Sequence, residues 1–424
     1  MKVRRLSRRT VVFTVVFLAT ATSIASELPS SFAAKRSTQS VWKFDFGDAG
    51  AETGYVAVDA ETAYDASKGY GFADVSQVKN ASASGKGALA DAVEFTTVNK
   101  NNTFDVDLPQ GLYQIDVALG NTTRSSIRAE GVIQIVNMTG NNAVDSFVIP
   151  IVDGRLNVMA TEGKAGAAFT LSSLEITKLS DDVETPPTIW VCGDSTVCNY
   201  YPLDRSVQAG WAQMIGKYAD SSKFMIRNMA AGGQFAKGIL DAGLFDAIET
   251  YGKKGDYFIV SVGINDGKYS NADEYRAAVT DMTRRAKKKD MTVVLVKQQG
   301  RANDISRPEL LKGRWFGGVL DEIGAAENVQ VVDLFTLAQN YWLSVGQDEV
   351  YKLFMKGDTL HPNRAGADKL AELVASAIDF DASDAPTETA DMLEDLFDEE
   401  KRWEANEREA DFQERLEKGI EKGD

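Results

Sequence analysis

The hydrophobic positions of this chain follow two different periods, one before and one after the linker that ends at residue 187. Up to residue 179, short runs rich in Val, Ile, Phe and Tyr alternate with polar residues and are separated by Gly, Asn, Asp and Ser. This alternation is typical of strands that have one face in a core and one in solvent. The runs lie at residues 43–47, 102–109, 111–120, 131–138, 146–160 and 172–179. The pattern predicts an all-β sandwich, or jelly roll, over residues 41–180.

Beyond residue 187 the chain alternates between apolar strands and amphipathic helices. Near-continuous apolar runs lie at residues 188–192, 224–229, 257–263, 292–298 and 329–334. Helical periodicity is clearest at residues 272–289 and 365–378. Apolar strands separated by helices indicate a parallel sheet with helices on both faces. We therefore predict an α/β domain over residues 188–380, with three αβα layers around a five-stranded parallel sheet of flavodoxin-like type. Its site is expected beyond the carboxyl ends of the strands.

Composition separates three further segments. Residues 181–187 are polar and contain Pro, as expected of a linker. Residues 1–25 place Lys and Arg before an apolar run and small residues, which predicts a secretory signal peptide cleaved after Ala25 or near Ala33. We therefore expect a secreted, extracellular protein with no membrane segment after signal removal. Residues 381–424 are acidic with apolar residues at helical intervals, which predicts an amphipathic helix or a disordered tail.

Charge and cysteine content narrow the classes of function. The formal net charge is −16 at pH 7, which argues against nucleic acid as a partner. The two cysteines, Cys192 and Cys198, do not make a disulfide scaffold, although an exported chain could pair them. Their spacing fits no zinc motif, and the chain has one histidine, so we expect no metal site. The sequence has no Gly-rich phosphate loop, and we expect no cofactor.

Candidate chemistry follows the first three strands of the α/β domain. Ser195 lies in GDST after the first strand, Gly232 and Gly233 lie in NMAAGG after the second, and Asn265 lies in GIND after the third. Each of these short sequences, taken alone, is more often only a tight turn. Because the carboxyl ends of parallel strands meet at one edge, we expect these groups to converge. A hydroxyl and well-placed N–H donors are what ester cleavage requires.

The single histidine, His361, lies in DTLHPN shortly before the last predicted helix, and Asp358 precedes it by three residues. A carboxylate at this spacing can accept a hydrogen bond from the imidazole N–H. That bond fixes the tautomer and supports the positive charge formed when the other ring nitrogen takes a proton. A lone histidine here is more often an exposed or capping residue. Its occurrence in chain order with the serine, glycine and asparagine sequences favours a catalytic role.

The four sequences GDST, NMAAGG, GIND and DTLH resemble the four blocks of the SGNH (GDSL-like) hydrolase superfamily. More narrowly, GDST, N-x-A-x-G-G and D-x-x-H-x-N-x-x-G-A resemble the rhamnogalacturonan acetylesterases of carbohydrate esterase family 12. The opening WKFDFGDAGAETGY is similar to the galactose-binding-like sandwich domain that precedes the esterase domain in many bacterial members. The resemblance covers about residues 41–380 and leaves the acidic tail unexplained.

The resemblance implies roles for the matching residues. Ser195 would be the nucleophile, His361 the general base and acid, and Asp358 the carboxylate that orients the histidine. Asp194, beside the nucleophile, is expected to have a structural role instead.

The resemblance also implies an oxyanion hole. Its donors would be the N–H of the nucleophile, the N–H of Gly233 and the side-chain amide of Asn265, with Gly232 as the alternative to Gly233. The chain departs from the family at Ile264, where a His is usual, and at Gln234, where an Arg is usual. Both positions lie near the substrate and outside the triad, so these departures affect the expected specificity for the acetylated substrate more than the expected reaction.

The sequence thus predicts an enzyme: a secreted two-domain esterase that removes acetyl groups from plant cell-wall polysaccharide, with rhamnogalacturonan as the first candidate and xylan as the second. Arg301 and Trp315, after the fourth strand, could contact an acidic sugar and a pyranose face, although a surface salt bridge and a core position are their commoner roles. One alternative is a lipid or lysophospholipid esterase of the same superfamily, which an apolar lid would favour. The other is a noncatalytic glycan-binding protein, against which the intact Ser195, Asp358 and His361 argue. The oligomeric state stays open.

Overall fold

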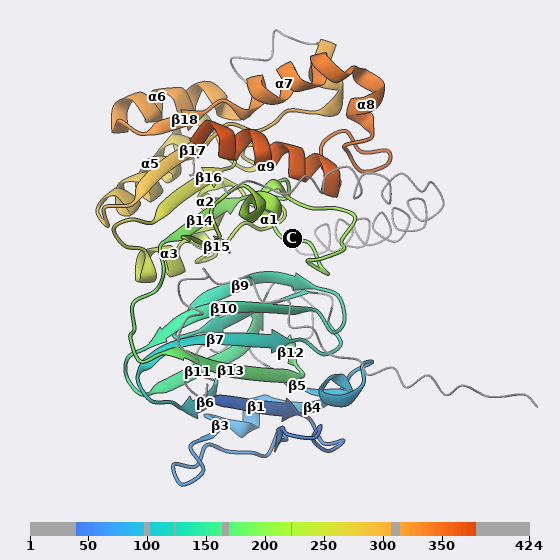
Figure 1. Ribbon diagram of the computed structural model, residues 1–424, viewed down its shortest axis with the longest axis vertical. Coiled ribbons are helices and arrows are strands. Elements are labelled where there is room, and N and C mark those ends of the chain that lie inside the picture. The colour runs from blue at the N-terminus through green and yellow to red at the C-terminus, as the bar shows by residue number, and fades with distance from the viewer. Residues whose placement is uncertain are drawn as a thin grey trace, which may run out of the picture.

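The computed structural model describes residues 40–96, 102–122, 124–162, 169–221, 223–306 and 314–378. The predicted signal peptide and the acidic tail lie outside these ranges. Figure 1 shows an all-β part followed by an α/β part, stacked along the long axis of the molecule. Within the described ranges, no helix is both long and apolar enough to span a bilayer.

The all-β part is built from sheets that face each other across one core, and their strands pair antiparallel except for β1 with β2. Two sheets have five strands, in the orders β10-β7-β13-β1-β2 and β3-β6-β11-β8-β9, and a smaller one has the order β12-β5-β4. The strands are β1 (Val41–Phe46), β2 (Val56–Val58), β3 (Tyr70–Phe72), β4 (Val78–Ser82), β5 (Asp91–Phe95), β6 (Phe104–Asp107), β7 (Gly111–Ala118), β8 (Arg124–Ala129), β9 (Val132–Thr139), β10 (Val144–Ile151), β11 (Arg155–Glu162), β12 (Phe169–Leu171) and β13 (Ser173–Ser180). The predicted sandwich is confirmed.

Aromatic residues fill the centre of the sandwich. Phe46 and Phe104 meet edge to face with ring centroids 4.9 Å apart, and Phe72 packs against Phe104 and Phe95. Edge-to-face contact between rings adds to the stabilisation that burial of their apolar surface gives. The alternating pattern of the sequence thus corresponds to strands with one inward face.

The α/β part contains one parallel sheet with the strand order β15-β14-β16-β17-β18. Its strands are β14 (Thr188–Gly193), β15 (Met225–Asn228), β16 (Tyr257–Ser261), β17 (Thr292–Val296) and β18 (Gln330–Val332). Counted along the chain, this is the 2-1-3-4-5 order of flavodoxin-like folds. The predicted five-stranded parallel sheet is confirmed.

Helices cover both faces of this sheet. They are α1 (Trp211–Met214), α2 (Ala236–Asp241), α3 (Asp246–Tyr251), α4 (Asp266–Tyr269), α5 (Ala272–Lys287), α6 (Gly317–Glu327), α7 (Leu334–Val345), α8 (Gln347–Tyr351) and α9 (Arg364–Ile378). Val191 and Ile259 lie in one buried cluster with residues of α1, α7 and α9, whereas Trp190 and Phe258 lie in another with residues of α3, α5 and α6. Neighbouring strand residues therefore serve opposite faces, which gives three layers.

The two parts meet at β15, the edge strand of the parallel sheet. Met225 forms a small buried cluster with Leu112 and Val148 of the sandwich. The guanidinium of Arg227, only 7% exposed, donates hydrogen bonds to the Val148 carbonyl at 3.2 Å and to the Gln134 side chain at 2.7 Å. A buried guanidinium requires such acceptors, because an unpaired buried charge is costly. Arg227 of the α/β part therefore depends on acceptors that the sandwich provides.

Candidate active site

Ser195 lies on a tight turn that begins where β14 ends. The Asp194 carbonyl accepts hydrogen bonds from the N–H groups of Val197 and Cys198 at 3.1 and 3.0 Å. The Asp194 carboxylate accepts from the Thr196 N–H at 2.9 Å, which closes the turn from inside. Burial raises the pKa of Asp194 to about 6, although the bonds from Thr196 and the charge of the nearby histidine oppose that shift. Asp194 thus shapes the turn that carries the serine.

The structure brings together the three residues of the predicted triad. Ser195 Oγ lies 2.9 Å from His361 Nε2, and His361 Nδ1 lies 2.6 Å from Asp358 Oδ2. The other oxygen of Asp358 accepts from the N–H groups of Leu360 and His361 at 2.6 and 3.2 Å. Burial alone would raise the pKa of Asp358, but these hydrogen bonds and the charge of His361 hold it below its ordinary value. An ionised Asp358 keeps the proton on Nδ1 and leaves Nε2 to accept from the serine.

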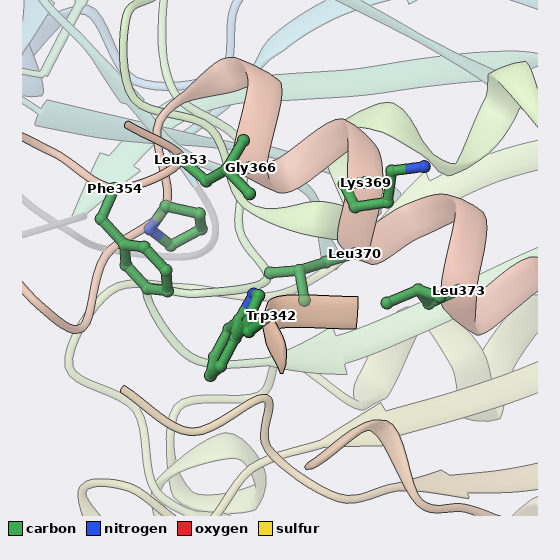
Figure 2. Close-up of a pocket in the computed structure, with 8 residues that line it drawn as sticks. Trp342, Leu353, Phe354, Gly366, Lys369, Leu370 and Leu373 are labelled. Carbon is green, nitrogen blue, oxygen red and sulfur yellow. The ribbon is translucent and has the colours of Figure 1, made fainter. Parts of the chain in front are cut away.

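His361 lies in the loop between α8 and α9, residues 352–363, which we call the histidine loop. This loop is fixed by backbone hydrogen bonds and by apolar packing. The Met355 N–H donates to the His361 carbonyl at 3.0 Å. Pro362, the next residue, lines a small apolar pocket with Trp342, Phe354 and Leu370 beneath α9 (Figure 2). The loop is therefore held from both sides, and the histidine is not a free residue at the start of a helix.

The first turn of α9 approaches this loop closely at Gly366. A Cβ atom at that position would lie 1.9 Å from the Leu353 carbonyl oxygen, a backbone atom that cannot move aside. Only glycine lets the helix and the loop that bears the histidine come this near.

The loops that carry the predicted oxyanion donors follow β15 and β16, and the first of them approaches the serine at Gly232. A Cβ atom built on Gly232 would be 3.9 Å from the Ser195 Cβ, and Gly233 has φ of +80°, a conformation that favours glycine. The Asn265 side chain donates from Nδ2 to the Gln234 carbonyl at 2.9 Å. An amide nitrogen has two N–H donors, so this bond orients the side chain and leaves the second donor for another acceptor.

Residues 262–265, between β16 and α4, form the loop that carries Asn265, which we call the asparagine loop. Arg301 and Trp315 lie between the histidine loop and the asparagine loop. Arg301 Nη1 is 3.4 Å from the Thr359 hydroxyl, and its guanidinium carbon is 6.0 Å from the Trp315 ring centroid. The Trp315 carbonyl oxygen is 2.5 Å from where a Gly263 Cβ would be, in the asparagine loop. Trp315 is half-buried with φ of 48°, so it is not a core residue. Within the described ranges, Arg301 has no carboxylate partner.

Asp266 is a buried group that sequence reasoning passed over, although it follows Asn265 directly. Its side chain is fully buried, and Oδ1 accepts from the Ala236 N–H at 2.9 Å. Oδ2 has no hydrogen-bond partner among the described residues. Burial, with a smaller contribution from the charge of Asp194, raises the pKa of Asp266 from 3.8 to about 6. The only signal in the sequence was an acidic residue beside Asn265, three positions after the apolar run at 257–263.

This shift predicts a pH-dependent stability that Asp266→Asn removes. Between pH about 4 and 6 the folded chain keeps a proton on Asp266 that the unfolded chain releases, so the free energy of unfolding falls as pH rises through this window. A shift of this size corresponds to at most about 3 kcal/mol. Asparagine cannot ionise. The free energy of unfolding of Asp266→Asn, measured in urea, should therefore increase relative to that of the wild type as pH rises from 4 to 6. The exposed control variant Asp290→Asn should show no such increase. If the free energies of unfolding of Asp266→Asn and the wild type differ by the same amount at every pH, the raised pKa of Asp266 is contradicted.

The two cysteines do not form a disulfide. Cys192 and Cys198 are both buried and free, and burial raises the pKa of each thiol. In the part of the chain that the structure describes, no group of three or more His, Cys, Asp and Glu side chains is placed to hold a metal ion.

Comparison with known proteins agrees with this architecture. Residues 42–177 match the model of the β-agarase/YxiM esterase-like, galactose-binding domain-like family, and residues 191–369 match that of the GDSL-like lipase/acylhydrolase family. The chain is 48% identical over 351 residues to a protein of Bacillus subtilis named uncharacterized esterase YxiM. The matched region covers 81% of this chain and 92% of that protein. It is 26% identical to the probable rhamnogalacturonan acetylesterase YesY of the same organism, over 45% of this chain and 91% of that protein.

Structural comparison gives the same family. The crystal structure of YxiM from Bacillus subtilis superposes with a TM-score of 0.78 at 48% identity, over 80% of this chain and 98% of that one. The resemblance seen in the four sequence blocks is therefore confirmed. This chain is an ester hydrolase of the GDSL-like (SGNH) family, with an N-terminal galactose-binding-like domain of the kind found in YxiM.

Proposed function

We propose that this protein is a secreted serine esterase that removes O-acetyl groups from plant cell-wall polysaccharide, with rhamnogalacturonan as the first substrate and xylan as the second. The observation that carries the proposal is the hydrogen-bonded chain from Ser195 through His361 to Asp358, at 2.9 and 2.6 Å. The sequence of residues 1–25, which lie outside the described ranges, supports secretion.

The proposed reaction passes through an acyl-enzyme. Ser195 Oγ attacks the acetyl carbonyl carbon while its proton moves to His361 Nε2, and Asp358 stabilises the imidazolium that results. The negative charge on the carbonyl oxygen is met by the N–H groups of Ser195 and Gly233 and by the free N–H of Asn265. His361 then gives its proton to the ester oxygen of the sugar as the bond between that oxygen and the acetyl carbon breaks, and the sugar leaves with a free hydroxyl. A water molecule, deprotonated by the same histidine, releases acetate from the serine.

The distances favour this proposal over a noncatalytic glycan-binding role. A binding protein would not need the serine hydroxyl within hydrogen-bond distance of a histidine whose other nitrogen faces a carboxylate. The relative YesY, named a probable rhamnogalacturonan acetylesterase, supports an acetylated pectic substrate.

The direct test measures acetate release by the purified chain. Acetylated rhamnogalacturonan, acetylated xylan, a lysophospholipid and an aryl acetate would be compared at equal concentrations of ester. We expect the highest kcat/KM on the rhamnogalacturonan. Cleavage of the lysophospholipid with none of the polysaccharides would establish the lipid esterase instead. Failure to hydrolyse even the aryl acetate would contradict any esterase role.

Arg301→Gln should discriminate between the two polysaccharides. A guanidinium without a carboxylate partner among the described residues, beside the histidine loop of an acidic protein, suits a uronate of the substrate. Loss of one charge-assisted hydrogen bond should raise KM for acetylated rhamnogalacturonan about tenfold or more. KM for xylan and for the aryl acetate should stay within about twofold, as should all values for the exposed Arg205→Gln. Equal increases on both polymers would count against a uronate contact.

Asn265→Ala should lower kcat by about 10²- to 10³-fold with little change in KM, because an oxyanion donor acts mainly in the transition state. The exposed Asn340→Ala provides the control for loss of an amide elsewhere in the domain. Steady-state kinetics on an aryl acetate are sufficient for the comparison. A wild-type kcat in a folded Asn265→Ala protein would remove Asn265 from the oxyanion hole.

A further inference from the structure

Two consecutive glutamines lie just beyond the carboxyl end of β17, and neither belongs to the triad. The side chains of Gln298 and Gln299 are 3% and 0% exposed. Neighbouring residues of an extended chain point to opposite sides. The two amides accordingly reach two different loops of the site.

Gln298 contacts the turn that bears the nucleophile. Its Nε2 donates to Asp194 Oδ2 at 3.2 Å, and its Oε1 lies 3.1 Å from the Thr196 hydroxyl, whose single proton also has Asp194 Oδ1 within reach at 2.8 Å. Asp194 and Thr196 are the two neighbours of Ser195 in the chain. One amide group therefore contacts the serine turn on both sides of the nucleophile, and its bond to Asp194 holds the turn.

Gln299 contacts the loop that bears the histidine. Its Nε2 donates to the Leu360 carbonyl at 3.2 Å, directly before His361. A few residues further on, the Ala302 N–H donates to the Thr359 carbonyl at 2.7 Å. The same short stretch of chain thus binds the histidine loop at two consecutive carbonyls.

Gln299 makes one hydrogen bond and leaves one buried acceptor unpaired, which indicates that it does more than stabilise the fold. Its Oε1 is buried and has no partner among the described residues. A buried acceptor without a donor costs free energy, so an apolar side chain of similar size would pack there at less expense. What the amide adds is the single bond to the histidine loop.

We propose that Gln298 and Gln299 are positioning residues that together set the distance between Ser195 and His361. The serine and the histidine are 166 residues apart in sequence, yet both their loops are tied to this one dipeptide. Proton transfer depends steeply on such a distance, since a misplacement of about 1 Å can cost about 10²-fold in rate. The inference rests on the proposed serine esterase function.

The test replaces each glutamine by methionine, which keeps the length and removes the amide. In the full chain, Gln298→Met and Gln299→Met should each lower kcat on an aryl acetate about 10- to 100-fold with KM changed by less than about twofold. Gln339→Met is the matched control: Gln339 is 7% exposed in α7, and its amide nitrogen is also unpartnered in the described ranges. It should keep the wild-type kcat.

A second readout does not depend on activity. Because the chain has one histidine, ¹⁵N-labelled protein gives one set of imidazole signals. Gln299→Met should shift and broaden the Nδ1–H signal of His361, whereas Gln339→Met should leave it in place. If a methionine variant does not fold, leucine at the same position also removes the N–H donor without adding a buried charge.

Two outcomes would overturn the positioning role. One is wild-type kcat in folded variants at positions 298 and 299. The other is a loss of kcat that follows thermal stability and appears equally in Gln339→Met. An inactive wild-type enzyme would refute the proposed function alone, because the imidazole signals would still report whether the glutamines hold the histidine loop.

Discussion

Ser195→Ala is expected to lower esterase turnover by about 10⁴-fold or more while the protein keeps its fold. The hydroxyl makes its hydrogen bond to His361 at 2.9 Å, whereas the turn itself is held by Asp194 and Thr196. Removing one oxygen from this position therefore removes the nucleophile and little of the packing. The residual rate should come from the oxyanion donors and from binding.

The matched control is Ser261→Ala, at the end of the neighbouring strand β16. The Ser261 hydroxyl is buried and has no partner among the described residues, so its loss should leave kcat unchanged. Both variants would be compared with the wild type in aryl acetate hydrolysis and in thermal unfolding. Substantial turnover by a folded Ser195→Ala protein would show that another group attacks the ester.

Modification of the single histidine is expected to inactivate the enzyme in proportion to the reaction of one imidazole. Diethyl pyrocarbonate acylates histidine, and this chain has only His361 to offer. An acylated ring cannot take the proton from Ser195, so activity and the absorbance of the modified imidazole should change together. A bound substrate analogue should slow both changes.

Two variants complete this test. His361→Ala should lose activity to about the extent of Ser195→Ala, because the two residues act as one unit. Asp358→Asn should lower kcat by about 10²- to 10⁴-fold, since it disturbs the tautomer that the 2.6 Å hydrogen bond fixes. Full activity after complete modification, or in His361→Ala, would leave the histidine a structural role only.

The architecture was readable from the sequence because buried parallel strands have a strong pattern. The apolar runs at 188–192 and 257–263 correspond to β14 and β16, and the helix expected at 272–289 is α5, which ends at Lys287. The proximity of Ser195 and His361 was predictable for a related reason: Ser195 follows a recognisable strand and His361 precedes a recognisable helix, and the carboxyl ends of parallel strands converge.

Other parts of the site depend on contacts that no local pattern encodes. Gln298 and Gln299 follow a strand as many polar residues do, and only the folded chain shows that each reaches a different loop. Trp315 is half-buried and has a left-handed backbone conformation, which no local sequence pattern predicts. The free state of the two cysteines is likewise visible only in the folded chain.

The contact of the sandwich with β15 has a consequence for the solubility of the enzyme. The outer edge of a sheet can pair with the edge of another molecule, which makes exposed edge strands a common starting point for aggregation. Here β15 is such an edge, and its residues Met225 and Arg227 pack against Val148 of the sandwich. A chain shortened to begin at Pro187 would uncover an apolar side chain, a guanidinium without acceptors and a strand open to self-association. The sandwich thus covers side chains on the edge strand that the isolated catalytic domain would expose.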